Sequence, residues 1–161
     1  MQIRDEQAGD ADAIRALHTI AFGQSQEARL VDQLRADGDS VISLLAIEAE
    51  CIVGHVLFSP MAAPFQALGL APLAVLPRAQ GQGIGSALVE AGLQRAAAGP
   101  WQAVFVLGDP AYYGRFGFEA ALARGFLSPY AGPHLMARAF GAGLPVREGR
   151  IDYAPAFAAL G

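Results

Sequence analysis

Apolar positions recur with two periods along the first sixty residues. Where they return every third or fourth position they predict amphipathic helices, and short apolar runs bounded by turn residues predict strands. The pattern predicts a first strand near Ile3, helices over 10–22 and 25–38, and strands over 41–48 and 52–59 joined by a tight turn at 49–51. Asp10 and Ser25 are the expected N-caps of the two helices.

The segment 68–86 is the centre of the chain. Residues 73–76 are all apolar, which predicts a central strand buried on both faces and ended by Pro77. Pro72 cannot donate to a strand ladder, so it indicates a bulge or an edge. Apolar residues then recur with helical spacing from Ile84 until Gly99-Pro100, which predicts the end of that helix.

The second half of the chain continues the alternation of strand and helix. A strand is expected over 103–107, followed by a turn crowded with aromatic residues. Residues 121–161 are rich in proline and glycine, with strands expected near 135–140 and 149–153 that close the sheet in antiparallel fashion. No repeat or linker divides the sequence, which predicts a single α/β domain over 1–161.

Three glycines surround the start of the helix at Ile84. Gly81, Gly83 and Gly85 leave backbone amides exposed at the positive end of the helix, an arrangement that binds phosphate without lysine or arginine. A tight turn with no ligand is the alternative. The chain has no lysine and therefore no Walker loop, and the glycine spacing differs from the dinucleotide fingerprint.

The turn resembles the acetyl-CoA signature of the GNAT family of N-acetyltransferases. That signature is Gln/Arg-x-x-Gly-x-Gly/Ala, which residues 80–85 match. A second family motif, Tyr-x-x-x-Gly-Phe, is matched by Tyr113, Gly117 and Phe118. The segments LAPLAVLP, QGQGIGSAL and LGDPAYYGRFGF resemble a bacterial, YhbS-like branch of predicted acetyltransferases.

The resemblance implies the GNAT acyl-CoA N-acyltransferase fold: a mixed, largely antiparallel sheet of about six or seven strands with flanking helices and a splayed central strand pair. The pantetheine arm of acetyl-CoA would lie in the gap beside 73–76, where free N–H groups of Ala74 and Val75 would hold the thioester oxygen. The expected cofactor contacts are Leu73, Ala74, Val75, Gln80, Gly81, Gln82, Gly83, Ile84, Gly85, Ser86, Tyr112, Arg115 and Phe116.

The implied reaction is direct transfer of an acetyl group from acetyl-CoA to an amine in a ternary complex. Tyr113 is the expected general acid, since a phenol can donate a proton to the leaving thiolate; packing against Phe116 and Phe118 is the alternative. A protonated amine must first lose a proton. The candidate bases, direct or through water, remain open: Glu48, His55, Glu27 and Glu50.

The acceptor is expected to be a small-molecule amine or a protein amino group. The family resemblance places Phe22, Glu27 and Arg29 on one wall of the acceptor site, with the loop 124–134 above it. Cys51 is expected to be a small hydrophobic residue and not an acetyl carrier. The alternative functions are a catalytically silent acyl-CoA-binding or regulatory domain and a nucleotide-binding regulatory domain.

Composition limits the partners. A net charge of −4 over 161 residues disfavours nonspecific binding to nucleic acid. There is no apolar run of membrane-spanning length and no signal-peptide core, and the single cysteine fits a reducing compartment, so we expect a cytoplasmic protein without membrane contact. No metal is expected, and a monomer and a homodimer are both compatible with the sequence.

Overall fold

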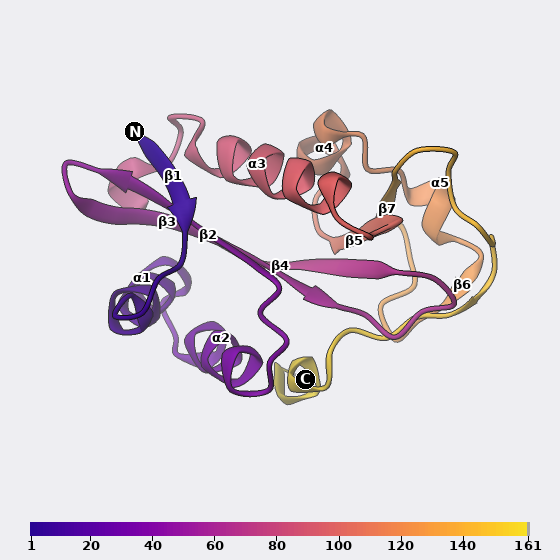
Figure 1. Cartoon of the computed structure of the whole chain (residues 1–161), viewed down its shortest axis with the longest axis horizontal. Coiled ribbons are helices and arrows are strands. Elements are labelled where there is room, and N and C mark those ends of the chain that lie inside the picture. Colours follow the sequence, from indigo (N-terminus) through magenta and orange to yellow (C-terminus); the bar gives the residue numbers. More distant parts are fainter. Residues whose placement is uncertain (161) are drawn as a thin grey trace.

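The computed structural model describes residues 1–160 and shows a six-stranded sheet with helices on both faces (Figure 1). The strand order is β1-β2-β3-β4-β5-β7, with β4 and β5 parallel and every other neighbouring pair antiparallel. The six strands are β1 (Gln2–Asp5), β2 (Ile42–Glu48), β3 (Cys51–Pro60), β4 (Ala67–Val75), β5 (Ala103–Leu107) and β7 (Leu135–Ala139). This is the mixed, largely antiparallel sheet expected from the sequence.

The longer helices divide between the two faces of the sheet. One face is covered by α3 (Ile84–Ala98), and the other by α1 (Ala11–Phe22), α2 (Gln26–Ala36) and the 3-10 turn η3 (Pro155–Leu160) (Figure 1). The remaining short elements are η1 (Pro77–Ala79), α4 (Pro110–Tyr113), η2 (Gly114–Phe116) and α5 (Ala120–Ala123). Among residues 1–160, no helix combines the length and apolarity needed to cross a bilayer.

The first two helices begin where the pattern predicts, but the two expected caps act differently. The Asp10 side chain accepts from the N–H of Gln7 at 2.7 Å and pairs with Arg4 at 2.8 Å, and so makes no cap bond to α1. The Ser25 hydroxyl accepts from Arg29 at 2.6 Å and does not cap α2. In both cases an arginine nearby binds the oxygen that would otherwise accept from the helix amides.

Strand β4 pairs with β3 along its length but with β5 only at its beginning. Ala67, Leu68 and Gly69 pair with 103–105, and beyond Gly69 the two strands separate. The register against β3 shifts between Val56 and Phe58, so Ala71 and Pro72 together oppose one residue, which is the bulge indicated by the proline.

The separation of the strands corrects one expectation. Of residues 73–76 only Ala74 is buried, while Leu73, Val75 and Leu76 are half-buried. Among the described residues, no strand pairs with them on the β5 side, so this segment is not covered as a central strand would be. The splayed central pair is therefore present, and it leaves a gap along the second half of β4.

The structure also corrects the pairing that was expected for the C-terminal strands. Leu135–Ala139 pairs antiparallel with β5 as expected, but β8 (Gly149–Arg150) pairs in parallel with β6 (Phe126–Leu127) in a separate small sheet. Glu119 and Ala137 exchange backbone hydrogen bonds of 2.9 and 3.1 Å, which occupy the outer edge of β7. The edge of β7 is therefore not free for β8, which pairs with β6 instead.

Helix α3 approaches the sheet closely through a glycine. A Cβ at Gly92 would overlap the ring of Phe58 in β3, and both residues are buried. The apolar side of α3, including Leu88, Val89 and Leu93, fills the core on this face. This packing fixes the N-terminus of α3 next to the end of β4, where the glycine turn lies.

Candidate functional site

The gap between β4 and β5 exposes backbone groups of β4. Leu76 donates its N–H to the carbonyl of Val53 on β3 at 2.9 Å. Because successive residues of a strand point their N–H groups to opposite sides, Ala74 also donates towards β3, while Leu73 and Val75 point theirs into the gap. The expected oxyanion donor Ala74 is therefore corrected: Leu73 and Val75 are the residues whose amides face the gap.

The glycine turn presents a row of free amides at the start of α3. Gly81 and Gly83 adopt left-handed backbone conformations, with φ of 77° and 81°. Within residues 1–160, the six backbone N–H groups of residues 81–86 find no hydrogen-bond acceptor. Gly83 at the N-cap has no side chain to cover them, so the turn and the helix dipole form a site for an anion.

Several of the expected cofactor residues gather around this turn. Gln80 donates from Nε2 to the carbonyl oxygen of Val75 at 3.1 Å, at the mouth of the gap. Arg115 donates from Nη2 to the Ser86 hydroxyl at 3.2 Å, and its guanidinium lies 4.6 Å above the ring of Tyr112. A positive side chain thus stands beside the free amides.

Tyr112 and Phe116 take different positions in the same segment. The hydroxyl of Tyr112 lies 3.0 Å from where a Cβ would stand on Gly85, so this glycine makes room for the phenol over the helix N-terminus. Phe116 is buried at 7% exposure in the core under α3. Its ring supports the segment and the Arg115 guanidinium, 5.4 Å away, and does not line the turn.

Tyr113 is held in an aromatic cluster at the end of β5. Its ring lies edge-to-face with Tyr112 at 4.9 Å and with Phe118 at 5.9 Å. It also packs against the backbone of Gly108, where an added Cβ would come within 2.5 Å of the ring. Burial, with a smaller effect of Tyr112, raises the pKa of Tyr113 to about 12, so the phenol stays protonated at neutral pH.

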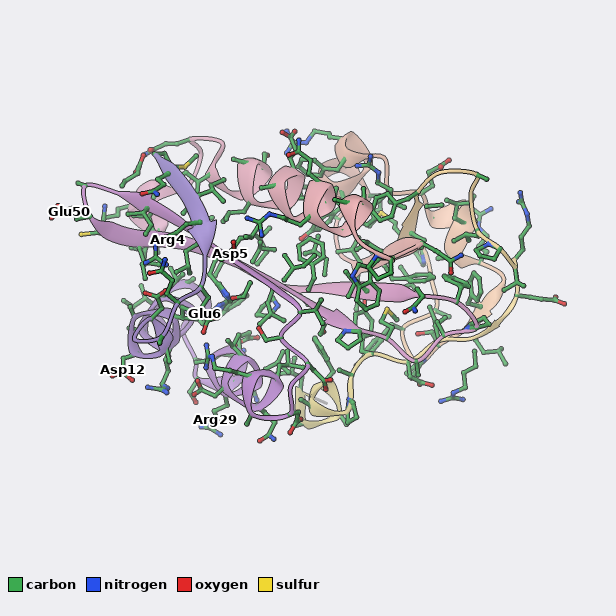
Figure 2. All side chains as sticks on the ribbon, viewed as in Figure 1. Arg4, Asp5, Glu6, Asp12, Arg29 and Glu50 are labelled. Atoms are coloured by element: carbon green, nitrogen blue, oxygen red, sulfur yellow. The ribbon has the colours of Figure 1, made fainter. Side chains whose placement is uncertain are left out.

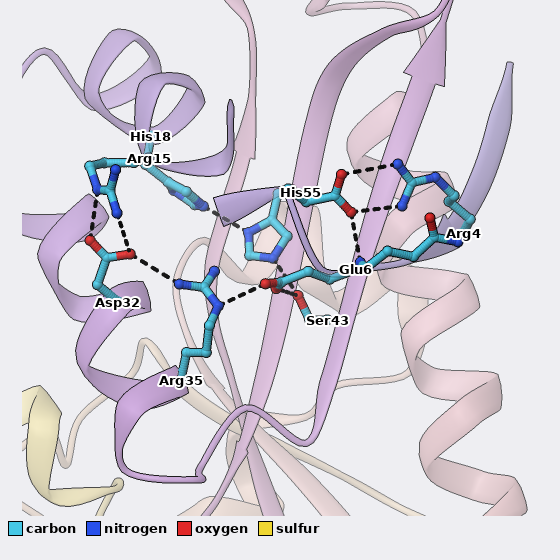
Figure 3. A network of polar contacts seen from close by, with 10 residues as sticks. Arg4, Glu6, Arg15, His18, Asp32, Arg35, Ser43 and His55 are labelled. Carbon is cyan, nitrogen blue, oxygen red and sulfur yellow. Dashed lines mark hydrogen bonds and ion pairs between the residues drawn. The ribbon is translucent and has the colours of Figure 1, made fainter. Parts of the chain in front are cut away.

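His55 belongs to a buried chain of hydrogen bonds between β3 and α1 (Figure 3). Its Nε2 lies 2.8 Å from the Ser43 hydroxyl, which itself donates to Glu6 at 2.6 Å, and its Nδ1 lies 2.8 Å from Nε2 of His18. Since the Glu6 carboxylate only accepts, the hydroxyl must accept from His55, and His55 must accept from His18.

His18 and His55, the two histidines of this hydrogen-bond network, are neutral and fully buried. Burial lowers the pKa of His18 to about 4, and burial, then His18 and Arg35, lower the pKa of His55 well below its usual value. With both ring nitrogens bonded, His55 makes no direct contact with anything in the gap. Two ion pairs close the network, because Arg35 pairs with both Glu6 and Asp32.

The carboxylates proposed as bases lie away from the gap. Glu48 ends β2 at the hairpin, and Glu50 stands at the tip of that hairpin, at one end of the molecule (Figure 2). Glu27 accepts from the Gln24 amide on the α1–α2 side. The predicted acceptor contacts Phe22 and Arg29 are surface residues of α1 and α2, and Phe22 stacks on His18 at 5.9 Å.

A pocket of about 200 Å³ opens where β4 and β5 separate, and we call it the aromatic pocket. Its aliphatic lining is Leu70, Ala71, Leu107 and Leu160, and its rings are Tyr130, Tyr153 and Phe157. Sequence reasoning placed Tyr130 in a loop above the acceptor site but missed Tyr153 and Gly108. Their roles depend on packing against distant parts of the chain, for which the local sequence carries no signal.

Two other features bear on the chemistry. In the part of the chain that the structure describes, no three histidine, cysteine or acidic side chains are placed to hold a metal ion. A larger cavity of about 520 Å³ lies between α2 and η3; it shares Leu160 with the aromatic pocket, and none of its lining residues belongs to the glycine turn. The gap, the free amides and Tyr113 therefore remain the arrangement suited to a long ligand with a phosphate group.

Comparisons with known proteins agree with this geometry. Residues 11–118 match the model of the acetyltransferase (GNAT) family. Two N-acetyltransferases of Escherichia coli strain K12 that are named as uncharacterized are similar in sequence. YhbS is 43% identical over 125 residues, 75% of each chain. YjhQ is 41% identical over 133 residues, 77% of this chain and 73% of its own.

Two solved structures are similar over nearly the whole chain. YhbS from Escherichia coli in complex with CoA matches with a TM-score of 0.92 and 35% identity, covering 99% of this chain and 93% of the other. A GNAT family acetyltransferase from Brucella melitensis in complex with acetyl-CoA matches with a TM-score of 0.84 and 35% identity, covering 97% of each. The expected fold class is confirmed.

Proposed function

The chain belongs to the acetyltransferase (GNAT) family, and we propose that it transfers an acetyl group from acetyl-CoA directly to an amine in a ternary complex. The observation that carries the proposal is the row of six free amides at 81–86 beside the unpaired edge of β4. The two similar structures contain CoA and acetyl-CoA. The family and its YhbS-like branch were both expected from the glycine turn and the Tyr113 motif.

The cofactor is expected to follow the gap from one end to the other. Its pyrophosphate would bind the amides of the glycine turn, with Arg115 and the Ser86 hydroxyl at its side. The pantetheine arm would pair with the free edge of β4 past Val75. The thioester would then lie near Leu73, where an N–H faces the gap.

The chemistry assigned to these groups is as follows. The neutral amine attacks the thioester carbon, forming the C–N bond and placing negative charge on the oxygen, which accepts from the gap-facing N–H of Leu73 or Val75. The nitrogen then loses a proton to water, the C=O bond re-forms as the C–S bond breaks, and the thiolate takes a proton from the Tyr113 phenol, which solvent reprotonates. Desolvation raises the proton affinity of the thiolate as well as that of the phenol, so the transfer stays feasible.

We assign the removal of the amine proton to water. In the described part of the chain, no carboxylate or imidazole lines the aromatic pocket. Glu48 lies at the hairpin and His55 is buried with both nitrogens bonded. The cytoplasmic location and the oligomeric state stay predictions.

Isothermal titration with acetyl-CoA tests the cofactor site. We expect micromolar binding by the wild type and its loss in Gly83→Glu, whose carboxylate would repel the pyrophosphate. Gly38→Glu is the matched control, because Gly38 has a φ of 78° and equally open surroundings away from the turn. Equal loss in both variants, or no binding by the wild type, would contradict the site. Binding without release of CoA on any amine would instead indicate a silent acyl-CoA-binding domain.

A further inference from the structure

The aromatic pocket lies at the inner end of the gap. Leu70 and Ala71 are the first residues of β4 after the last one paired with β5, and Leu107 is the last residue of β5. The pocket therefore opens on the part of the gap next to Leu73, where the proposed function places the thioester. Leu107 is 46% exposed, so the pocket also opens to solvent.

The lining of the pocket selects for apolar groups. Within residues 1–160, none of its lining side chains carries a charge. A second cationic group of an acceptor would lose its hydration there and meet no carboxylate, whereas an apolar group gains free energy on leaving water. For scale, an engineered protein cavity of roughly 150 Å³ binds benzene. A volume of about 200 Å³ is thus enough for one ring.

Tyr153 forms the floor of the pocket and carries a polar atom without a partner. Its ring packs on the backbone of Gly69, where an added Cβ would lie 2.5 Å from Cε1, and lies 5.6 Å from Tyr130 and 5.1 Å from Phe157. Its buried hydroxyl has no hydrogen-bond partner in the described chain. Burial, with smaller effects of Tyr130 and Tyr113, raises the pKa of Tyr153, so its phenol stays protonated.

The spacing along β4 limits the length of the acceptor. Ala71 lies two residues from Leu73 across the bulge at Pro72, so their Cα atoms are at most about 7 Å apart. The attacking nitrogen must come within roughly 3–3.5 Å of the thioester carbon. The difference leaves room for about two or three bonds between the nitrogen and a group in the pocket.

We propose that the aromatic pocket binds the ring of an apolar primary amine with a short alkyl spacer, such as an arylethylamine. The inference rests on the proposed acetyl transfer and names its acceptor class. A polyamine or a lysine-rich peptide would place a second cation against an uncharged wall.

The test compares amines at saturating acetyl-CoA by release of the CoA thiol. We expect kcat/KM for 2-phenylethylamine to exceed that for spermidine by about a hundredfold, the scale set by burying one ring. Leu107→Asp places a carboxylate at the mouth of the pocket and should lower that ratio at least tenfold. Leu127→Asp is the matched control, since Leu127 is 70% exposed on β6 outside the pocket, and should leave the ratio unchanged.

Two results would overturn the inference. One is a preference of the wild type for spermidine, and the other is an amine ratio that Leu107→Asp does not alter. If Leu107→Asp leaves the amine ratio unchanged but alters the choice between acetyl-CoA and hexanoyl-CoA, the pocket belongs to the acyl chain.

Calorimetric titration of 2-phenylethylamine into the CoA-saturated protein tests the pocket without any transfer. Binding that Leu107→Asp weakens and Leu127→Asp preserves would support the inference even if no transfer occurred, and absence of binding would overturn it. Efficient transfer to spermidine alone would overturn the inference and leave the proposed function standing.

Discussion

At the scale of single residues, Tyr113 has a phenol with a raised pKa and lies just after the end of β5. Its pKa of about 12 keeps the phenol protonated across the working range of an enzyme at neutral pH. The hydroxyl is not among the buried groups that lack a partner, unlike that of Tyr153. A protonated phenol that solvent can reach is suited to donate a proton and to be reprotonated.

Tyr113→Phe should therefore lower kcat while leaving acetyl-CoA binding unchanged. General acid catalysis contributes roughly 10²–10⁴-fold, which sets the expected loss. Steady-state kinetics and calorimetry on the same preparation measure the two quantities. Tyr112→Phe is the comparison, because Tyr112 lies over the helix N-terminus and should affect cofactor binding more than kcat. Unchanged turnover in Tyr113→Phe would leave the tyrosine with a packing role only.

The backbone of Gly108 packs against the Tyr113 ring and so determines where that ring lies. A Cβ there would come within 2.5 Å of the ring, so Gly108→Ala should move the phenol and lower kcat by roughly tenfold or more, since small misplacements of a reacting group are costly. Gly114→Ala is the matched control, because a Cβ at Gly114 has nothing within 4 Å. Equal kinetics of the two variants would show that the ring tolerates the shift.

The sequence could predict those site residues that belong to a short motif. The glycine turn and Tyr113 carry a motif, and the structure brings Gln80, Ser86 and Arg115 to the same turn. The choice between Ala74 and its neighbours depends on strand register, which the apolar run does not encode. Tyr153 meets Gly69 across more than eighty residues, so no window of sequence contains the pair.

At the scale of elements, α3 is the part whose placement determines the anion site. Its N-terminus carries the free amides, and its contact with β3 through Gly92 and Phe58 fixes how close that terminus lies to the gap. The helix was predictable from apolar spacing and from Gly99-Pro100. The destination of the C-terminal strand was not, because it depends on Glu119 already occupying the edge of β7.

Gly92→Ala should destabilise the protein in spite of the better helix propensity of alanine. Propensity favours the variant by up to about 1 kcal/mol, whereas overpacking a buried contact costs typically 1–3 kcal/mol. We expect a net loss of about 1–2 kcal/mol in the free energy of unfolding, measured by urea denaturation. Gln94→Ala, on the exposed side of the same helix, should change it by less than about 0.5 kcal/mol. A more stable Gly92→Ala would show that Phe58 moves aside freely.

At the scale of the whole molecule, the buried network joins the N-terminal strand to both helices of one face. The chain from His18 through His55 and Ser43 ends on Glu6, and Arg35 ties Glu6 to α2. Every hydrogen bond in it points towards the carboxylate, which requires His55 to be neutral, and burial keeps His18 neutral by lowering its pKa to about 4. Protonating His55 would add a donor where an acceptor is needed, and protonating His18 would place a proton on its buried Nδ1, which has no hydrogen-bond partner in the described chain.

The stability of the molecule should therefore fall on mild acidification. His18 has a pKa of about 4 when folded against an ordinary value of 6.5, so the unfolded chain binds more protons between these values and the free energy of unfolding decreases as pH falls. For His18 alone the loss between pH 7.5 and pH 5 is about 2 kcal/mol, and His55 acts in the same direction. Urea denaturation at the two pH values measures it.

A substitution and a direct titration separate the histidines from other acid-sensitive groups. His18→Phe keeps an aromatic ring against Phe22 but removes the titrating group, so the variant should be less stable at pH 7.5 and lose less stability on going to pH 5. His134→Gln, at an exposed position, should keep the full pH dependence of the wild type. If His18→Phe does not fold, the imidazole resonances of the wild type still decide the point. Resonances of His18 that titrate near 6.5 in the folded protein would contradict the buried neutral pair, because burial of the His18 ring should lower its pKa to about 4.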